Sequence, residues 1–208
     1  MLQQDIDKTL QEALQVLRKG GVILYPTDTV WGIGCDATLP RAVARVYALK
    51  RRSDSKSLVL LASGLDMVAR YVRRIPDMAI DLVEVNDKPM TLIYPGAVSG
   101  PAPEGDVLPE GDRYHLAFNT VAEDGSVGIR IPTVEWCRRL ADKLGRPLVS
   151  TSANISGEPA PGRYADVAEE IRAGVDYTVD PRLEKGATGT ASQIIKVDLD
   201  GSVRIIRM

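Results

Sequence analysis

Apolar and polar residues alternate along the chain with two different periods, which predict helices and strands in turn. Between Ile6 and Leu17 the apolar residues recur every three or four positions, and the Gly20-Gly21 pair follows, so we predict an amphipathic helix that ends there. Short apolar runs bounded by turn residues predict strands instead. By these criteria further helices are predicted at about 40–50, 63–72, 77–85, 133–144 and 164–171, and strands at 22–25, 58–62, 90–94, 114–121, 127–131, 147–149, 176–179, 193–197 and 203–206. This mixture, with no internal repeat and no linker, predicts an α/β fold in which residues 1–208 form a single domain on a twisted, largely mixed β-sheet with flanking helices.

Several boundaries of these elements have their own local signals. Ser63 and Asp66 have the spacing of a capping box, and Thr133 is a residue type that caps helix N-termini. Gly145 follows the last apolar position of the helix that Thr133 begins, and it is predicted to end that helix. The segment 95–112 is rich in glycine, proline and acidic residues, has neither period, and is predicted to be a loop.

Composition predicts a globular protein of the cytoplasm. Hydrophobic residues make up 44% of the 208 positions, which is enough to bury a core of that size. No apolar run approaches the roughly 20 residues that span a membrane, and the N-terminus lacks the basic and apolar regions of a signal peptide, so we expect no membrane association. Cys35 and Cys137 lie far apart and His115 is the one histidine, so neither a disulfide framework nor a zinc site is predicted.

The distribution of charge bears on the kind of ligand. A formal net charge of −2 argues against a protein whose main task is to hold nucleic acid, because such domains carry a basic excess. Positive charge is instead gathered locally at Lys50, Arg51, Arg52 and Lys56. This cluster is either a solvated helix end, where the helix dipole favours a cation, or part of an anion site. Because the chain has neither a GxxxxGK[ST] nor a GxGxxG motif, any phosphate binding would have to use such cations.

Two polar segments follow apolar strands and are candidates for a binding site. Thr27 and Thr29 come directly after the first predicted strand, where their hydroxyls either satisfy backbone groups or contact a ligand. Ser150, Ser152 and Asn154 come after a later apolar strand. They either form an Asx or Ser turn, or they line the carboxyl edge of a sheet, where α/β proteins bind ligands. A cationic cluster beside two polar turns suits an anionic substrate.

Three short motifs stand out in these segments: Pro26-Thr27-Asp28, Lys50-x-Arg52-x-x-x-Lys56 and Ser152-Ala153-Asn154. Together they resemble the YrdC family of threonylcarbamoyl-AMP synthases, and the resemblance extends over nearly the whole chain. It implies a single YrdC-like domain. The chain departs from the family's pattern at Ser57, where relatives have proline, and at Leu61, where many have histidine.

The resemblance also implies a role for each candidate residue. Lys50 and Arg52 would be catalytic, because cations stabilise the negative charge that develops on the leaving phosphate oxygens. Without the resemblance, Arg130 would be interpreted as a surface residue of a strand. The residues implied in binding L-threonine are Thr29, Arg130, Ser150 and Ser192. The residues implied in binding ATP are Arg52, Lys56, Ser126, Ser152, Asn154 and Arg207.

The activity implied by the resemblance is the synthesis of threonylcarbamoyl-AMP and pyrophosphate from L-threonine, bicarbonate and ATP, the first step of the t6A modification of tRNA. Mg²⁺ is expected with ATP, and no carboxylate cluster predicts a protein-built metal site. The expected partners beyond the substrates are the proteins that transfer the threonylcarbamoyl group to tRNA. Two alternatives stay open: a protein that binds double-stranded RNA or tRNA directly, and a YciO-type paralogue with a weak or different reaction.

Overall fold

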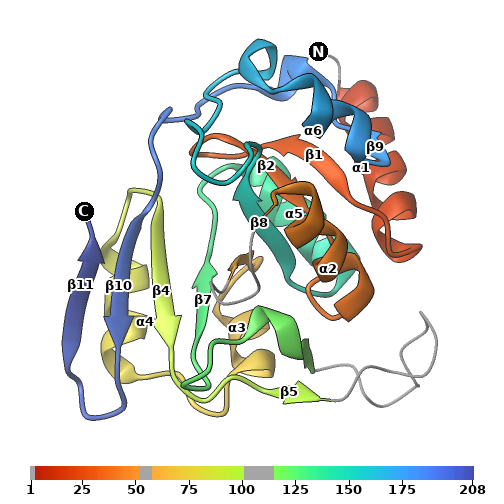
Figure 1. Ribbon diagram of the computed structural model, residues 1–208. Coiled ribbons are helices and arrows are strands. Elements are labelled where there is room, and N and C mark those ends of the chain that lie inside the picture. Colours follow the sequence, from red (N-terminus) through yellow and green to blue (C-terminus); the bar gives the residue numbers. More distant parts are fainter. Residues whose placement is uncertain (1–2, 52–57, 101–114) are drawn as a thin grey trace.

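A nine-stranded sheet crosses the whole molecule in the computed structural model, which describes residues 3–51, 58–100 and 115–208. Its strands are β1 (Ile23–Pro26), β2 (Trp31–Gly34), β3 (Val59–Leu61), β4 (Met90–Tyr94), β7 (Val127–Arg130), β8 (Leu148–Ser152), β9 (Tyr177–Thr178), β10 (Gln193–Val197) and β11 (Val203–Arg207). Their order is β11-β10-β4-β7-β3-β8-β2-β1-β9, and Figure 1 shows β11 at one side of the molecule and β9 at the other. A separate short ladder joins β5 (Ser99–Gly100) and β6 (Leu116–Ala117).

The sheet is mixed, as the sequence predicts. β3 pairs with β7, β4 with β10, and β1 with β9 in parallel. The other neighbouring strands of the sheet are antiparallel. The fold class predicted from the apolar pattern is therefore confirmed.

Helices flank this sheet. They are α1 (Gln3–Arg18), α2 (Pro40–Leu49), α3 (Leu65–Tyr71), α4 (Asp77–Val85), α5 (Glu135–Leu144) and α6 (Glu169–Gly174), with the 3₁₀ turns η1 (Phe118–Thr120), η2 (Tyr164–Asp166) and η3 (Pro181–Leu183). α1 and α5 pack on each other, and the Arg139 guanidinium of α5 binds the Asp7 carboxylate of α1 at 2.6 Å. No helix in the described part of the chain is both long and apolar enough to cross a membrane.

The predicted helix ends are partly right. Gly145 ends α5 as predicted, in the left-handed conformation with φ 75°. The predicted N-terminal caps are wrong, because Ser63 and Thr133 each precede the N-cap position and neither caps its helix. Thr133 instead donates its backbone N–H and its hydroxyl to the Asp28 carboxylate, at 3.0 and 3.3 Å. The N-cap position of α5 is Val134, so the Thr133 hydroxyl donates to a buried acid instead of accepting from the first N–H groups of the helix.

Two corrections to the predicted strands affect the candidate site. The sequence does not predict β2, because Gly32 and Gly34 are typical of a turn; the strand pairs with β1 to form a hairpin. The residues Ser150 to Ser152 belong to β8 and do not form a turn after it. They pair with β2 and β3 and are the last three residues of β8, so they lie within the sheet at the carboxyl end of that strand.

The remaining differences lie outside the sheet's centre. The predicted strand 114–121 is only β6 followed by η1, and the predicted helix 164–171 is η2 followed by α6. In the predicted loop 95–112, β5 is formed, while residues 101–112 lie outside the described residues.

Candidate active site

A cavity of about 250 Å³ lies across the sheet, between the β1–β2 hairpin and the segment that leads into β10. Residues of six strands line it, from β2 to β11. The structure thus brings together side chains that are up to 180 positions apart, from Thr27 to Arg207. The predicted site residues that line the cavity are Thr29, Arg130, Ser150, Ser152, Ser192 and Arg207.

The β1–β2 hairpin presents two buried hydroxyls beside the cavity. The Thr27 hydroxyl donates to the Val30 carbonyl at 2.8 Å, and its oxygen lies 2.8 Å from the Thr29 hydroxyl. Because a hydroxyl has one proton to donate, Thr29 is the donor between the two threonines. The Thr29 oxygen keeps its lone pairs for a ligand, whereas Thr27 mainly closes the turn.

A buried cation forms another part of the wall. Arg130 is 4% exposed, and its Nη1 donates to the Asp28 carboxylate, which is itself 1% exposed. Its Nε has no hydrogen-bond partner among the described residues. A guanidinium offers a planar fork of donors that matches a carboxylate. This wall therefore suits the carboxylate of a small ligand.

The segment before β10 closes the opposite side of the cavity. The Ser192 hydroxyl lies 2.8 Å from the Thr91 hydroxyl, and Arg207 donates Nε and Nη2 to the Ser192 carbonyl at 3.0 and 2.7 Å. The backbone N–H groups of Thr188 and Gly189 donate to the hairpin carbonyls at 3.0 and 2.8 Å. The segment is thereby fastened both to the hairpin and to the last strand.

The structure gives Lys50 a different position from the predicted phosphate clamp. Its side chain is buried, and Nζ donates to the carbonyls of Ser152 and Asn154 at 2.5 and 2.7 Å and to the Asn154 Oδ1 at 3.3 Å. Asn154 in turn donates Nδ2 to the carbonyls of Ile155 and Glu158 at 3.0 and 2.7 Å. Lys50 and Asn154 together shape the turn after β8, next to the cavity.

Besides Asn154, three predicted ATP-binding residues are not placed in the cavity. Arg52 and Lys56 lie outside the described residues, as does Ser57. Ser126 is buried at the start of β7, where its hydroxyl donates to the Asp124 carboxylate at 2.6 Å, and it does not line the cavity. The structure therefore supports a local structural role for Ser126.

The interactions of Asp124 give an expected dependence of stability on pH. Hydrogen bonds from Lys196 and Ser126 lower the pKa of Asp124 from 3.8 to about 2. A lowered pKa contributes stability that is present above about pH 4 and is lost as the pH falls toward 2. In urea unfolding, wild type should be more stable than Asp124→Asn at pH 6, and the difference should shrink between pH 4 and pH 2. A difference that stayed constant over that range would contradict this role.

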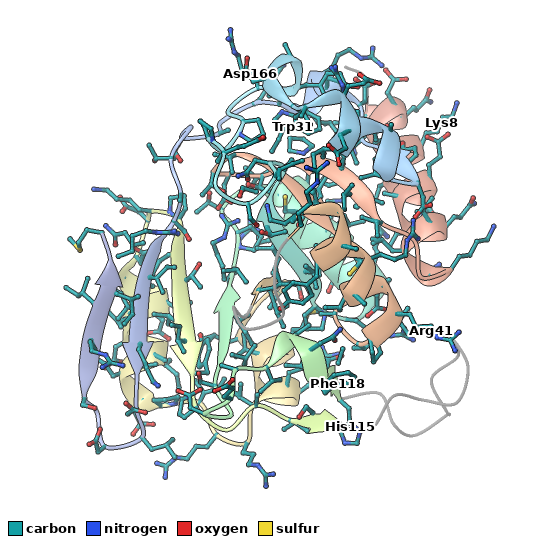
Figure 2. All side chains as sticks on the ribbon, viewed as in Figure 1. Lys8, Trp31, Arg41, His115, Phe118 and Asp166 are labelled. Atoms are coloured by element: carbon teal, nitrogen blue, oxygen red, sulfur yellow. The ribbon has the colours of Figure 1, made fainter. Side chains whose placement is uncertain are left out.

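Contacts of Trp31 also hold the β1–β2 hairpin in place. Figure 2 shows Trp31 inside the molecule, beneath the segment that carries Asp166. The Trp31 Nε1 and the Tyr164 backbone N–H both donate to the Glu184 carboxylate, at 2.5 and 2.6 Å. The rings of Trp31 and Tyr164 lie 5.2 Å apart, so packing and hydrogen bonding hold the hairpin in one position.

No cysteine in the described part of the chain is suited to nucleophilic catalysis. Burial raises the pKa of the Cys137 thiol to about 12 and that of Cys35 well above its usual value. A thiol is reactive as the thiolate, which these values disfavour at neutral pH. Among the described residues, no three His, Cys, Asp or Glu side chains gather in a way that would hold a metal ion.

Sequence reasoning assigned no role to Asp28, although it stands in a quoted motif. The structure shows that this acid receives donors from Arg130 of β7 and from Thr133 in the loop between β7 and α5. The sequence shows only an acid between two threonines, and the burial that gives Asp28 its contacts is not visible there.

Comparison with known proteins decides the family. The Sua5/YciO/YrdC family model, described as telomere recombination, matches residues 15–208. The chain belongs to the Sua5/YciO/YrdC family. The threonylcarbamoyl-AMP synthase of Xanthomonas axonopodis pv. citri (strain 306) is 34% identical over 198 residues, which cover 95% of this chain and 96% of that protein. The enzyme of the same name from Pseudoalteromonas translucida (strain TAC 125) is 31% identical over 94% of this chain and 96% of that protein.

Solved structures agree with this membership of the Sua5/YciO/YrdC family. P. abyssi Sua5 complexed with L-threonine has a TM-score of 0.69 and 25% identity over 90% of this chain, and the chain spans about half the length of that protein, 50%. E. coli YciO has a TM-score of 0.72 over 96% of this chain and 88% of that chain, with 20% identity, which shows the fold alone. The family and the fold implied by the motifs are thus confirmed, and the implied activity is the one that the Xanthomonas and Pseudoalteromonas relatives are named for.

Proposed function

We propose that this chain is a nucleotidyltransferase, an L-threonylcarbamoyladenylate synthase, which makes threonylcarbamoyl-AMP and pyrophosphate from L-threonine, bicarbonate and ATP. The observation that carries the proposal is that the buried Arg130 guanidinium and the Thr29 hydroxyl line the same cavity. A cation and a nearby acceptor match the carboxylate and the donor groups of an amino acid. The family supports the proposal, because a member was solved with L-threonine bound.

The amino acid is proposed to lie between the hairpin and β7. Its carboxylate would bind Arg130, and its hydroxyl would donate to the free lone pairs of Thr29. Ser150 and Ser192 line the same cavity and supply further hydroxyls. A site that hydrogen-bonds a substrate hydroxyl discriminates strongly against an analogue that lacks it.

The nucleotide is proposed to lie along β8 and β11. Ser152 and Arg207 line this part of the cavity, and Lys50 holds the Asn154 turn beside it. Arg52 and Lys56 are proposed as phosphate ligands on the strength of their motif alone. Mg²⁺ is proposed to arrive with ATP, bound to the phosphates.

The proposed reaction balances without a protein nucleophile. The threonine amine adds to the carbon of bicarbonate, and water leaves to give a carbamate. A carbamate oxygen then attacks the α-phosphorus, the bond from that phosphorus to the bridging oxygen breaks, and pyrophosphate leaves. Cations around the phosphates stabilise the charge that develops on the leaving group.

We propose that the reaction takes place in the cytoplasm and that its product passes to the proteins that modify tRNA. The net charge of −2 weighs against direct binding of tRNA or double-stranded RNA by the chain. A steep loss of RNA affinity between low and physiological salt would instead favour an RNA-binding role.

Substrate preference tests this proposal. Pyrophosphate release from ATP is measured with each of the twenty amino acids, with and without bicarbonate. L-threonine should be preferred, serine should be slower by roughly 10–200-fold for the missing methyl, and valine should be slower by roughly 10⁴-fold for the missing hydroxyl. Equal turnover of valine and threonine, or turnover without bicarbonate, would contradict the proposal.

A further inference from the structure

One carboxylate joins several parts of the cavity wall. Asp28 receives Nη1 of Arg130 on one oxygen, and its other oxygen receives the backbone N–H and the hydroxyl of Thr133 at 3.0 and 3.3 Å. Its backbone carbonyl accepts the Thr188 N–H at 3.0 Å. Asp28 thus connects the hairpin to β7, to the loop before α5 and to the segment before β10.

We propose that Asp28 is a positioning residue for the amino acid substrate: it holds the Arg130 guanidinium in the orientation that receives the substrate carboxylate. This inference rests on the proposed function, and it concerns affinity for the amino acid and not for the nucleotide. Asp28 is 1% exposed and does not line the cavity, so it acts through Arg130 and not by contact with the substrate.

The geometry of the guanidinium explains why a positioning residue is needed. A long side chain loses much rotamer freedom when it is fixed, and Arg130 has no partner for its Nε among the described residues. The Asp28 carboxylate holds the Nη1 end of the Arg130 guanidinium, and its negative charge balances the buried positive charge. The Thr133 donors in turn fix the carboxylate, so the whole group has one arrangement.

The chain contains a matched control. Asp36, which is 0% exposed, receives the backbone N–H and the hydroxyl of Thr38 at 2.9 and 2.6 Å and Nη1 of Arg146 at 2.7 Å. These are the same kinds of donor that Asp28 receives. Asp36, Thr38 and Arg146 do not line the cavity. Substitution of Asp36 therefore measures the loss of stability without a change at the binding site.

The experiment compares Asp28→Asn with Asp36→Asn in the full chain. Both variants should lower the melting temperature. Asp28→Asn should also raise the KM for L-threonine by roughly 10–100-fold while leaving the KM for ATP within about twofold, because only the guanidinium is displaced. Asp36→Asn should leave both KM values unchanged. Equal KM values for L-threonine in the two variants would overturn the positioning role.

A double substitution tests whether Asp28 acts through Arg130. In an Arg130→Gln background, Asp28→Asn should cause no further increase in the KM for L-threonine, since the group it positions is already absent. An additive increase would overturn the proposal. Should Asp28→Asn fail to fold, Asp28→Glu keeps the charge but shifts the guanidinium, and its KM for L-threonine should rise with that for ATP unchanged; an unchanged KM for L-threonine would overturn the role.

The wild-type measurements separate this inference from the proposed function. A wild-type protein that neither binds L-threonine in calorimetry nor releases pyrophosphate with it contradicts the proposed function, and the role of Asp28 falls with it. A wild-type protein that does both, with an Asp28→Asn variant equal to it, contradicts the positioning role alone.

Discussion

Replacing Lys50 with alanine should lower activity and stability together. The buried ammonium donates to two backbone carbonyls and one amide oxygen after β8, and alanine leaves these acceptors without their donor. Hydrogen bonds to a charged group contribute about 1.5–3 kcal/mol each, but the cost of burying the ammonium offsets much of their sum, so we expect a net loss of about 3 kcal/mol, or roughly 6–12 °C in Tm. Displacement of the turn by about 1 Å should reduce kcat/KM by roughly 10²-fold.

The neighbouring residue provides the control for Lys50. Arg51 pairs with Glu170 at 2.8 Å, and both side chains are more than half exposed, at 66% and 51%. An exposed ion pair contributes little, so Arg51→Ala should change Tm and pyrophosphate release only slightly. Loss of activity in Lys50→Ala with an unchanged Tm would contradict the turn-holding role and return Lys50 to the role of a phosphate ligand.

Replacing Gly34 with alanine should be the most damaging change to the hairpin. A Cβ at this position would lie 2.5 Å from the Val149 carbonyl oxygen and 2.6 Å from the Tyr25 ring. Neither neighbour can give way, because Val149 belongs to the adjoining strand and Tyr25 is fully buried. Overpacking of this kind costs about 1–3 kcal/mol and sometimes more, so we expect a loss of about 3 kcal/mol.

Gly64 is the matched control for this substitution. A Cβ there meets no atom within 4 Å, and the backbone is extended with φ 178°. Gly64→Ala should therefore leave the urea midpoint almost unchanged, whereas Gly34→Ala should lower it clearly. Equal midpoints for the two variants would contradict close strand packing at Gly34.

The apolar pattern predicts most strands of the sheet and most helices, because the buried face of each element sets the spacing of its apolar residues. The long helix that begins the chain and the strand β4 both follow from apolar spacing alone. β2 could not be predicted, because Gly34 is selected by the approach of β8 and not by strand propensity. Gly34 therefore marks close packing between β2 and β8.

The sequence predicts those residues of the site that the resemblance to the family implies. Thr29 and Arg130 are brought together as the resemblance implies, although they come from distant parts of the chain. The contacts of Lys50 were not predictable, because a cation at a helix end carries no sign of which carbonyls it will meet. The role of Asp28 depends on complete burial, which only the tertiary structure creates.

The central claim is tested most directly by the identity of the product. The protein is incubated with ATP, Mg²⁺, L-threonine and ¹³C-labelled bicarbonate, and the mixture is analysed by mass spectrometry. We expect an adenylate that contains threonine and one labelled carbonyl carbon, formed together with pyrophosphate. Pyrophosphate release without that labelled adenylate, or an adenylate that forms without bicarbonate, would contradict the synthesis of threonylcarbamoyl-AMP.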